Sequence, residues 1–295
     1  MREQLQLYWP AGSLAKGNLL VDLSPADAGW DYCGLAVVEI PAGGAWEWES
    51  GAREGVLLSL AGGCEASVDG RQFTLAGRKS VFTGVSDLLY IPAHSHLSVF
   101  SGAGGRFALP SSVASTKLQP WYCAARDVPV EVRGAQSATR QVNNFFAPEV
   151  FSADRLMAVE VLVPGGNWGS YPPHKHDHET GDEAKLEEIY YFEIDGEAGF
   201  GMQRLYTTDG SIDLTATVFS GDVVLIPKGY HGPSAAAPDF PMYFLNVLAG
   251  PGKERRMTFC DDPTYSYIRK RWEGQEVDTR VPMTGPASSG EQDGR

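Results

Sequence analysis

Short runs of strand-forming residues, separated by glycine, proline or Asp-Gly turns, fill most of this 295-residue chain. GLAVVEI at 34–40 and GVLLSLAGG at 55–63 are early examples, and LMAVEVLVP at 156–164 opens a second series. Such runs of four to eight residues with regular turns are typical of sandwiches and barrels. The chain also holds 34 glycines and 19 prolines, and no stretch keeps a helical period over a useful length. The pattern predicts an all-β fold.

The two halves of the chain repeat the same order of strands, hairpin and turn. In each half the series ends in an apolar run that closes on Ile-Pro and is followed by a histidine. This landmark lies at Tyr90–His96 in the first half and at Leu225–His231 in the second. We interpret this as an internal duplication of one β-barrel unit. The prediction is two tandem barrels, at 1–133 and 134–272, followed by a polar mobile tail at 273–295.

Two segments are expected to lie outside the barrel strands. Residues 1–30 are predicted to form an edge arm, with a short strand in LQLYW that ends at Pro10. Residues 110–140 have mixed charge and few apolar runs, so we expect a linker or a long connection there.

Four candidate metal ligands lie between Gly165 and His231. His174 and His176 form an H-x-H pair, and a strand places residues i and i+2 on one face, so both imidazoles can enter one cavity. Glu188 opens the apolar run IYYF, and His231 follows a P-x-G turn. Three imidazoles and one carboxylate suit Zn, Mn, Fe, Co or Ni, with coordination positions left for substrate or water.

The charge and the cysteines exclude several classes of function. A formal net charge of −13 argues against nucleic acid or an anionic membrane as a partner. No segment approaches 18 uninterrupted apolar residues, and the N-terminus has no apolar signal core. The four cysteines are scattered without a C-x-x-C pair, which favours reduced thiols. We therefore expect a cytoplasmic protein that binds no nucleic acid or membrane.

The second half resembles the cupin superfamily, whose motifs are G…H-x-H…E and G…P-x-G…H. Gly221, Pro227, Gly229 and His231 keep the second motif, whereas eleven residues separate His176 from Glu188, where a few are usual. Glu187 is therefore an alternative ligand. Glu188 fits better, because the pleat then places it with Tyr190 and Phe192 on the cavity face.

Two neighbours of the H-x-H pair have other expected roles. His178 is expected in solvent at the start of the loop. Asp177 either accepts a proton from a ligating imidazole or caps a turn.

The first half lacks a comparable ligand set. His94 and His96 occupy the place of the second motif, but Trp46 and Trp48 stand where imidazoles would be needed. We expect a degenerate, metal-free barrel that supports its neighbour. Cupins commonly associate through sheet edges, so a homo-oligomer is compatible with the sequence, which leaves the oligomeric state open.

A closer resemblance is carried by HKHD, LEEIYYF, GFGMQRLYTTDGSID, GDVVLIPKGYHGPSAAAP and YFLNVLAGP. These stretches resemble the 5-deoxyglucuronate isomerases of bacterial myo-inositol catabolism, which are related to the 4-deoxy-threo-hexosulose-uronate ketol-isomerases. The resemblance implies a metal-dependent conversion of 5-deoxy-D-glucuronate to 5-dehydro-2-deoxy-D-gluconate in the cytoplasm. A cation that chelates O1 and O2 would stabilise the cis-enediolate of such a reaction. Zn or Mn is our first choice, with Fe, Co and Ni as alternatives.

The sugar-acid substrate requires a cationic partner and a proton carrier. A guanidinium suits a carboxylate, and Arg204 is our first candidate because it lies mid-strand in the second barrel. Arg140 and Arg155 follow, and each could equally be a surface arginine in an ion pair.

The candidate proton carrier is Tyr190, which shares strand parity with Glu188 and could equally be core. Tyr206, Tyr230 and Glu187 are alternatives, and the two tyrosines are also candidate substrate contacts. Asn246 is expected to bind a substrate hydroxyl or to stabilise a turn.

Two other functions fit the same ligand set. One is an Fe-dependent cupin dioxygenase, because fold does not imply function. The other is a non-catalytic module that binds sugar acids, although an intact ligand set is more than passive binding requires.

Overall fold

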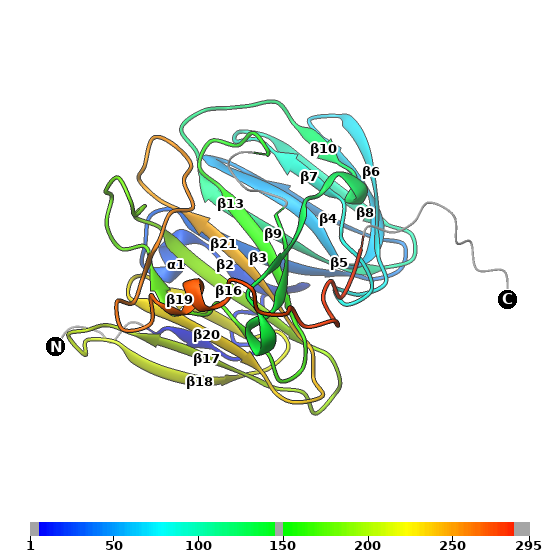
Figure 1. Ribbon diagram of the computed structural model, residues 1–295. Helices are drawn as coiled ribbons and strands as arrows, with labels where there is room; N and C mark the ends of the chain where they lie inside the picture. Colours follow the sequence, from blue (N-terminus) through cyan, green and yellow to red (C-terminus); the bar gives the residue numbers. More distant parts are fainter. Residues whose placement is uncertain (1–5, 145–149, 286–295) are drawn as a thin grey trace, which may run out of the picture.

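The structure, a computed structural model, describes residues 6–144 and 150–285. Two antiparallel β-barrels lie side by side, with the first in blue to cyan and the second in green to orange (Figure 1). The all-β prediction and the two-barrel prediction are confirmed. Helical structure in the described residues is limited to α1 (Pro25–Ala28), α2 (Ile268–Arg271) and the 3₁₀ turns η1 (Ala125–Asp127) and η2 (Gln136–Ala138).

One nine-stranded sheet curls into the first barrel. Its strands are β2 (Leu19–Leu23), β3 (Cys33–Ile40), β4 (Gly44–Glu49), β5 (Arg53–Val68), β6 (Arg71–Arg78), β7 (Leu88–Ile91), β8 (His96–Ser101), β9 (Gly105–Val113) and β10 (Trp121–Cys123). β5 is long enough to pair with β7 and β9 through its first part and with β6 and β8 through its second. This strand therefore turns the sheet back on itself.

Apolar side chains fill the interior of the first barrel. Leu57, Val68, Leu97 and Phe107 are fully buried there, and Trp48 packs against the same cluster. His94 is exposed at the surface, and the Nδ1 atom of His96 contacts an exposed carboxylate, that of Glu49, at 2.8 Å. The two histidines therefore do not converge on the interior of this barrel.

Two sheets face each other in the second barrel. The seven-stranded sheet has the order β1-β19-β16-β21-β13-β12-β11, and the other has the order β18-β17-β20-β15-β22 with β14 beside β20. Their bounds are β1 (Tyr8–Trp9), β11 (Val130–Arg133), β12 (Arg140–Asn143), β13 (Met157–Val163), β14 (Trp168–Gly169), β15 (His174–Lys175), β16 (Glu187–Ile194), β17 (Gly201–Tyr206), β18 (Asp213–Val218), β19 (Val223–Ile226), β20 (Tyr230–Ala236), β21 (Met242–Ala249) and β22 (Cys260–Asp261).

The expected boundary between the barrels needs correction. β11 and β12 pair with each other and join the seven-stranded sheet of the second barrel, so, apart from β1, the strands of that barrel begin at Val130 and not after residue 133. The region 110–140 is therefore not a linker, because it also holds β10, which pairs with β7. β11 is short and largely exposed, β10 has three residues, and β12 is buried but mostly polar, so none of the three has the apolar alternation of a strand with one buried face.

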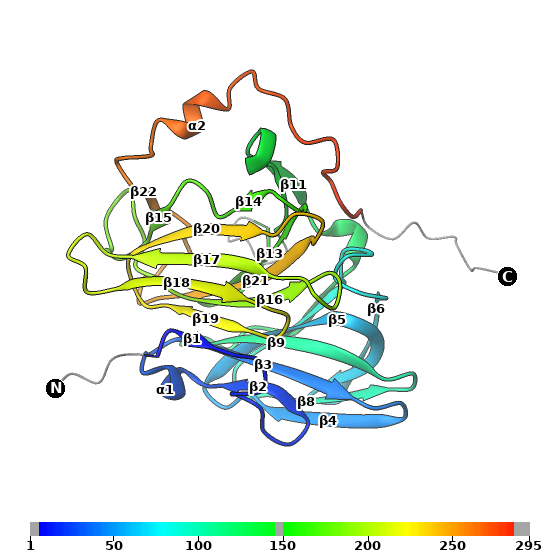
Figure 2. The same cartoon turned by 90° about the horizontal axis from the view of Figure 1, so that it is seen from below.

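The N-terminal arm crosses from the first barrel to the second. β1 pairs with β19, as the short strand predicted in LQLYW allows, and the Tyr8 hydroxyl donates to Asp222 at 2.8 Å. The blue β1 therefore lies against the sheet of the second barrel, beside β19 (Figure 2).

Residues 273–285 were expected in a mobile tail, and the structure contradicts that expectation. Val281 and Thr284 are buried, and the backbone N–H of Thr284 donates to Gln141 at 2.9 Å. Arg280 donates to the Gly165 carbonyl at 2.9 Å. Polar composition misled the prediction because this segment is held by hydrogen bonds more than by apolar burial. The remainder of the expected tail, 286–295, lies outside the described residues.

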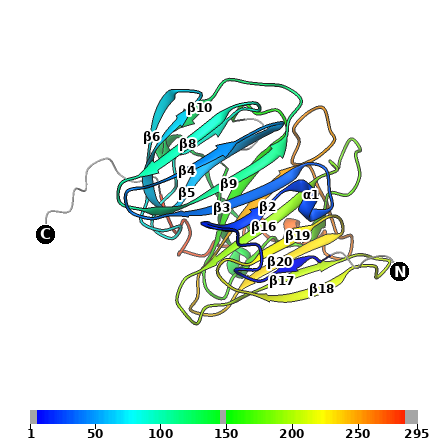
Figure 3. The same cartoon turned by 180° about the vertical axis from the view of Figure 1, so that it is seen from behind.

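The barrels pack against each other through the outer face of β16 and its neighbours. Ile189 and Tyr191 join a core cluster that also contains Leu35 and Val37 of β3. Seen from behind, β2 and β3 run alongside β16 and β19 (Figure 3). Because the opposite face of β16 lines the second barrel, both of its faces are buried, which explains the unbroken apolar run IYYF.

No helix in the parts of the chain that the structure describes is long and apolar enough to cross a membrane. All four cysteines are free, as expected; Cys33, Cys64 and Cys123 are buried.

Candidate metal centre

Each of the three histidines predicted as ligands has its ring fixed by a backbone carbonyl. The Nδ1 atom lies 2.9 Å from the Leu186 carbonyl in His176, 3.2 Å from the Gly229 carbonyl in His231, and 3.1 Å from the Pro172 carbonyl in His174. A carbonyl accepts only, so Nδ1 carries the proton in each neutral ring. The Nε2 atom of each imidazole is then left as a ligand atom.

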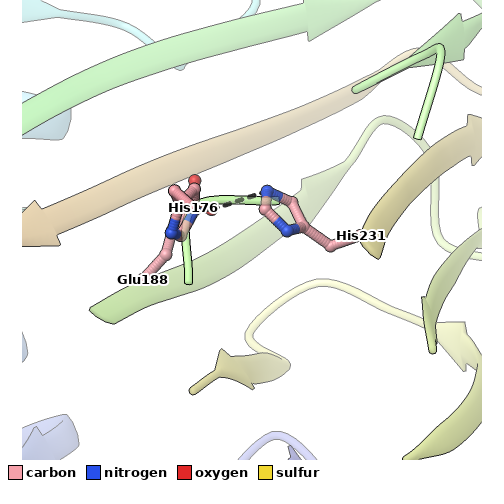
Figure 4. Close-up of side chains that lie close together, drawn as sticks. All are labelled: His176, Glu188 and His231. Carbon is pink, nitrogen blue, oxygen red and sulfur yellow. Dashed lines mark hydrogen bonds and ion pairs between the residues drawn. The ribbon is translucent and has the colours of Figure 1, made fainter. Parts of the chain in front are cut away.

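The carboxylate of Glu188 meets two of these rings. Its Oε2 atom lies 3.0 Å from Nε2 of His176 and 3.0 Å from Nε2 of His231, and Figure 4 shows the three side chains close together. His231 lies on β20, and His176 follows the end of β15. The three ligand atoms lie within 4.8 Å of one another. With its proton on Nδ1, His231 Nε2 has no hydrogen to donate to that carboxylate, so this buried nitrogen touches Glu188 without a hydrogen bond. A divalent cation would satisfy that atom, so the residues present fit a metal.

His174 stands at the edge of this cluster. It is the register partner of His231 across β15 and β20, and the two ring centroids are 4.5 Å apart. It is not one of the three residues whose ligand atoms lie within 4.8 Å of one another. The structure thus brings three of the four predicted ligands together and places the fourth beside them.

Burial and neighbouring charge set the protonation of the cluster. Burial and the adjacent His231 hold the pKa of His174 well below its usual range, so this ring is neutral and can act as a ligand. Burial alone would raise the pKa of Glu188, but His231 and His176 lower it well below its ordinary value. Burial alone would lower the pKa of His176. The hydrogen bond and the charge of Glu188 have the larger combined effect and raise this pKa. The cluster therefore holds a carboxylate ready to bind a cation.

Asn246 and Tyr190 form the wall beside the cluster. Asn246 Nδ2 donates to Glu188 Oε1, which leaves Oε2 for the imidazoles. Tyr190 is the register partner of Asn246, and its hydroxyl lies 2.9 Å from Ser170 Oγ. Burial, and next the Glu188 charge, raise the pKa of Tyr190 well above 10, so its phenol stays protonated at neutral pH.

A cavity of about 570 Å³ opens beside the cluster. The predicted residues His174, His176, Glu188, Tyr190 and Asn246 all line it. The rest of its lining is Pro129, Glu131, Arg133, Arg140, Val142, Asn144, Val150, Val159, Val161, Ser170, Leu186, Leu248, Met257, Thr258, Phe259 and Arg269. This volume suits a small-molecule ligand.

Three predicted substrate contacts lie elsewhere. Arg204 pairs with Asp213 and covers the Tyr206 ring, and the Tyr206 hydroxyl donates to Asp262 at 2.6 Å. On β17 the buried residues are Gly201, Gln203 and Leu205, so Arg204 and Tyr206 face outward. Tyr230 precedes His231 on β20, and its ring packs against Tyr206, on the face opposite to that of His231. None of the three lines the cavity.

Of the two other arginines predicted to bind the substrate carboxylate, one lines the cavity and one does not. Arg140, the second candidate for the carboxylate, lines the cavity, whereas Arg155 donates to the carbonyls of Gly250 and Gly252 outside it. Asp177 accepts from the Gly229 N–H at 2.8 Å and so caps the P-x-G turn. His178 is exposed.

Sequence reasoning missed Arg133 and Arg269 as cavity residues. Arg133 lies in the segment that was expected to be a linker, and no motif marks either residue. A strand assignment for 130–143 would have placed Arg133 and Arg140 opposite each other.

Solved structures define the class of protein. An IolB-like protein from Salmonella typhimurium LT2 matches with a TM-score of 0.83 and 32% identity, over 89% of this chain and 99% of that one. The oxalate decarboxylase of Lactobacillus farciminis matches with a TM-score of 0.60 over 84% of this chain and 87% of its own, and at 14% identity that likeness concerns the fold alone. The chain is a bicupin, built from two cupin barrels.

Sequence comparisons are more specific. The sequence model of the KduI/IolB family matches residues 7–268. The 5-deoxy-glucuronate isomerase of Geobacillus kaustophilus (strain HTA426) is 37% identical over 266 residues, which are 89% of this chain and 95% of that protein. The enzyme of the same name from Bacillus subtilis (strain 168) is 34% identical over 257 residues, 86% of this chain and 94% of its own. The chain therefore belongs to the KduI/IolB family.

Proposed function

We propose that this protein is an aldose–ketose isomerase that converts 5-deoxy-D-glucuronate to 5-dehydro-2-deoxy-D-gluconate. The observation that carries the proposal is the cluster of His176, Glu188 and His231, two of whose members, His176 and Glu188, line a cavity of sugar size. The relatives that cover most of the chain are named as 5-deoxy-glucuronate isomerases, which supports this substrate.

The proposal includes one divalent cation per chain, held by His174, His176, Glu188 and His231. Zn or Mn is the first choice, and Fe, Co or Ni also suits imidazole and carboxylate ligands. The buried Nε2 atom of His231, which makes no hydrogen bond within the described residues, and the neutral ring of His174 support this ligand set. When bound, the cation would supply a Lewis acid that stabilises negative charge on two adjacent substrate oxygens.

The protein's own side chains would orient the substrate and keep water away from it. Asn246 holds Glu188 in place, and the neutral Tyr190 phenol can donate a hydrogen bond to a substrate oxygen or return a proton. Val142, Val159 and Val161 make one wall of the cavity apolar. An apolar wall strengthens the polar interactions on the opposite side.

The test is a coupled assay for ketose formation from 5-deoxy-glucuronate, run under nitrogen. Activity is expected to disappear with a chelator and to return with Zn²⁺ or Mn²⁺. His176→Ala and His231→Ala should each lose at least 100-fold in kcat/KM together with the bound metal, whereas His178→Ala, in the exposed loop, should retain both. Full activity after complete metal removal would contradict the metal-dependent isomerase, and a requirement for oxygen would favour the dioxygenase instead. Sugar-acid binding without turnover would favour the non-catalytic module.

A cytoplasmic location is part of the proposal. It is supported by four free cysteines, none of them paired in the structure. Labelling of all four thiols in protein extracted under alkylating conditions would test it, because an oxidising compartment would protect some of them.

A further inference from the structure

Three of the described residues that line the cavity are arginines, and two of these have an acidic partner. Arg133 pairs with Glu131 at 2.8 Å, and Arg269 forms two bonds of 2.6 and 2.7 Å with Asp261. For Arg140, no carboxylate of the described residues lies within 4.0 Å of the guanidinium. Within the described part of the chain, its positive charge is therefore uncompensated.

The charge of Arg140 is buried. Arg140 is 7% exposed, its Nη1 atom donates to the Ala138 carbonyl at 3.1 Å, and its guanidinium lies over the ring of Trp272 at 5.5 Å. Burial, with Arg269 and Arg133 nearby, lowers the pKa of Arg140 to about 9. A buried guanidinium with one neutral hydrogen bond is expensive to leave unpaired, and a bound anion would remove that cost.

Strand pairing sets this charge on the same wall as the candidate metal centre. Arg140 and Val142 lie on the same face of β12, Asn144 follows the end of that strand, and all three line the cavity. His176, Glu188 and Tyr190 line this same cavity. The guanidinium of Arg140 and two of the candidate metal ligands therefore border one space.

We infer that Arg140 binds the carboxylate of the sugar acid while the carbonyl end of the same molecule lies at the cluster of Glu188, His176 and His231. This inference rests on the proposed function and deepens it, because it assigns the residue that selects uronates over neutral sugars. In a protein of net charge −13, such selection needs a local positive charge inside the cavity. A planar guanidinium matches the carboxylate in geometry as well as in charge.

The test compares two ligand pairs that differ only in the acid group. Isomerisation of 5-deoxy-glucuronate is compared with that of 5-deoxy-glucose, and calorimetric binding of D-gluconate is compared with that of D-glucitol. Arg140→Gln is expected to lower kcat/KM for the uronate on the order of 100-fold and to change kcat/KM for the neutral sugar less than threefold. In the binding measurement, this variant should no longer prefer gluconate over glucitol. Arg140→Lys should recover part of the loss, because it restores the charge without the planar fork. Arg204→Gln, an arginine of the same barrel paired with Asp213 outside the cavity, is the matched control and should change neither preference more than twofold.

The two readouts separate this inference from the proposed function. A wild-type protein that binds gluconate through Arg140 but isomerises nothing would keep the inference and remove the isomerase. An active isomerase whose Arg140→Gln variant loses uronate and neutral sugar equally, at unchanged metal content, would overturn the inference alone. Should Arg140→Gln unfold, the Arg140→Lys variant decides: an unchanged preference for both acids would overturn the inference, and a reduced one would support it. A wild-type protein without any preference for the acids would also overturn it.

Discussion

Glu187 and Glu188 are neighbours on β16 whose carboxylates lie on opposite faces of one sheet. Glu188 points into the second barrel, 3.0 Å from His176 and His231. The carboxylate of Glu187 points to the first barrel, where it accepts from the backbone N–H groups of three successive residues, Asp31, Tyr32 and Cys33, at 2.8–2.9 Å. The alternation of side chains along a strand thus separates a candidate ligand from a structural carboxylate.

We predict opposite phenotypes for the two glutamine variants. Glu188→Gln removes the charged ligand, so metal content should drop and kcat/KM fall at least 100-fold, with little loss of stability. Glu187→Gln weakens three charge-assisted bonds between the barrels and should cost about 2 kcal/mol of unfolding free energy. Activity per folded molecule should be retained in that variant. Elemental analysis and urea unfolding of both variants check this, and an exchange of the two phenotypes would contradict the assignment.

Asn246→Ala is expected to weaken metal binding without removing a ligand. Asn246 donates to Glu188 Oε1 and so orients the carboxylate. Loss of such a supporting hydrogen bond typically lowers metal affinity 10- to 100-fold. Competition with a chromophoric chelator measures it, and Asn18→Ala, on the exposed surface of the first barrel, is the control. An unchanged affinity would show that the strand alone holds Glu188.

A buried ion pair joins the barrels, and breaking it from one side should be severe. Arg78 of β6 pairs with Glu160 of β13, which also accepts from Asn143 at 3.0 Å and from Tyr243 at 2.8 Å. Arg78→Met leaves a buried carboxylate without its cation, so we expect a loss of about 3–5 kcal/mol in urea unfolding.

The double variant, Arg78→Met with Glu160→Leu, tests whether the pair itself stabilises the interface. It should recover part of the loss, because both charges are gone. Arg71→Met, at an exposed position, should lose less than about 1 kcal/mol. If Arg78→Met were as mild as Arg71→Met, the pair would contribute nothing to the contact between the barrels.

The contact of Tyr8 with Asp222 should make docking of the N-terminal arm sensitive to high pH. Burial, and next the hydrogen bond to Asp222, raise the pKa of Tyr8 to about 12. Because this value lies above the unfolded value near 10, the stability contributed by the neutral phenol is complete below pH 10 and is lost as the pH rises towards 12. The stability advantage of the wild type over Tyr8→Phe should therefore shrink across this range. Urea midpoints from pH 8 to 11.5 check it, and parallel curves for the two proteins would contradict it.

The sequence determined the fold class and the candidate ligands because both depend on local pattern. Short strands with turn residues predict barrels, and H-x-H, Glu188 and P-x-G-Y-H are readable because a pleat and a tight turn fix where those side chains point. Trp46 and Trp48, which stand where the motif would have imidazoles, predict a first barrel without ligands, and the structure places a cluster of apolar side chains in its interior.

Only the tertiary structure decided what surrounds the ligands. The sequence favours Arg204 over Arg140 as the guanidinium, but the pleat of β17 turns Arg204 outward and the pairing of β11 with β12 brings Arg140 into the cavity. Residues 273–285 look unstructured by composition, yet their polar groups are hydrogen-bonded to distant parts of the second barrel. Contacts between segments more than 100 residues apart leave no periodic signal in the chain, because they depend on how the sheets curl and meet.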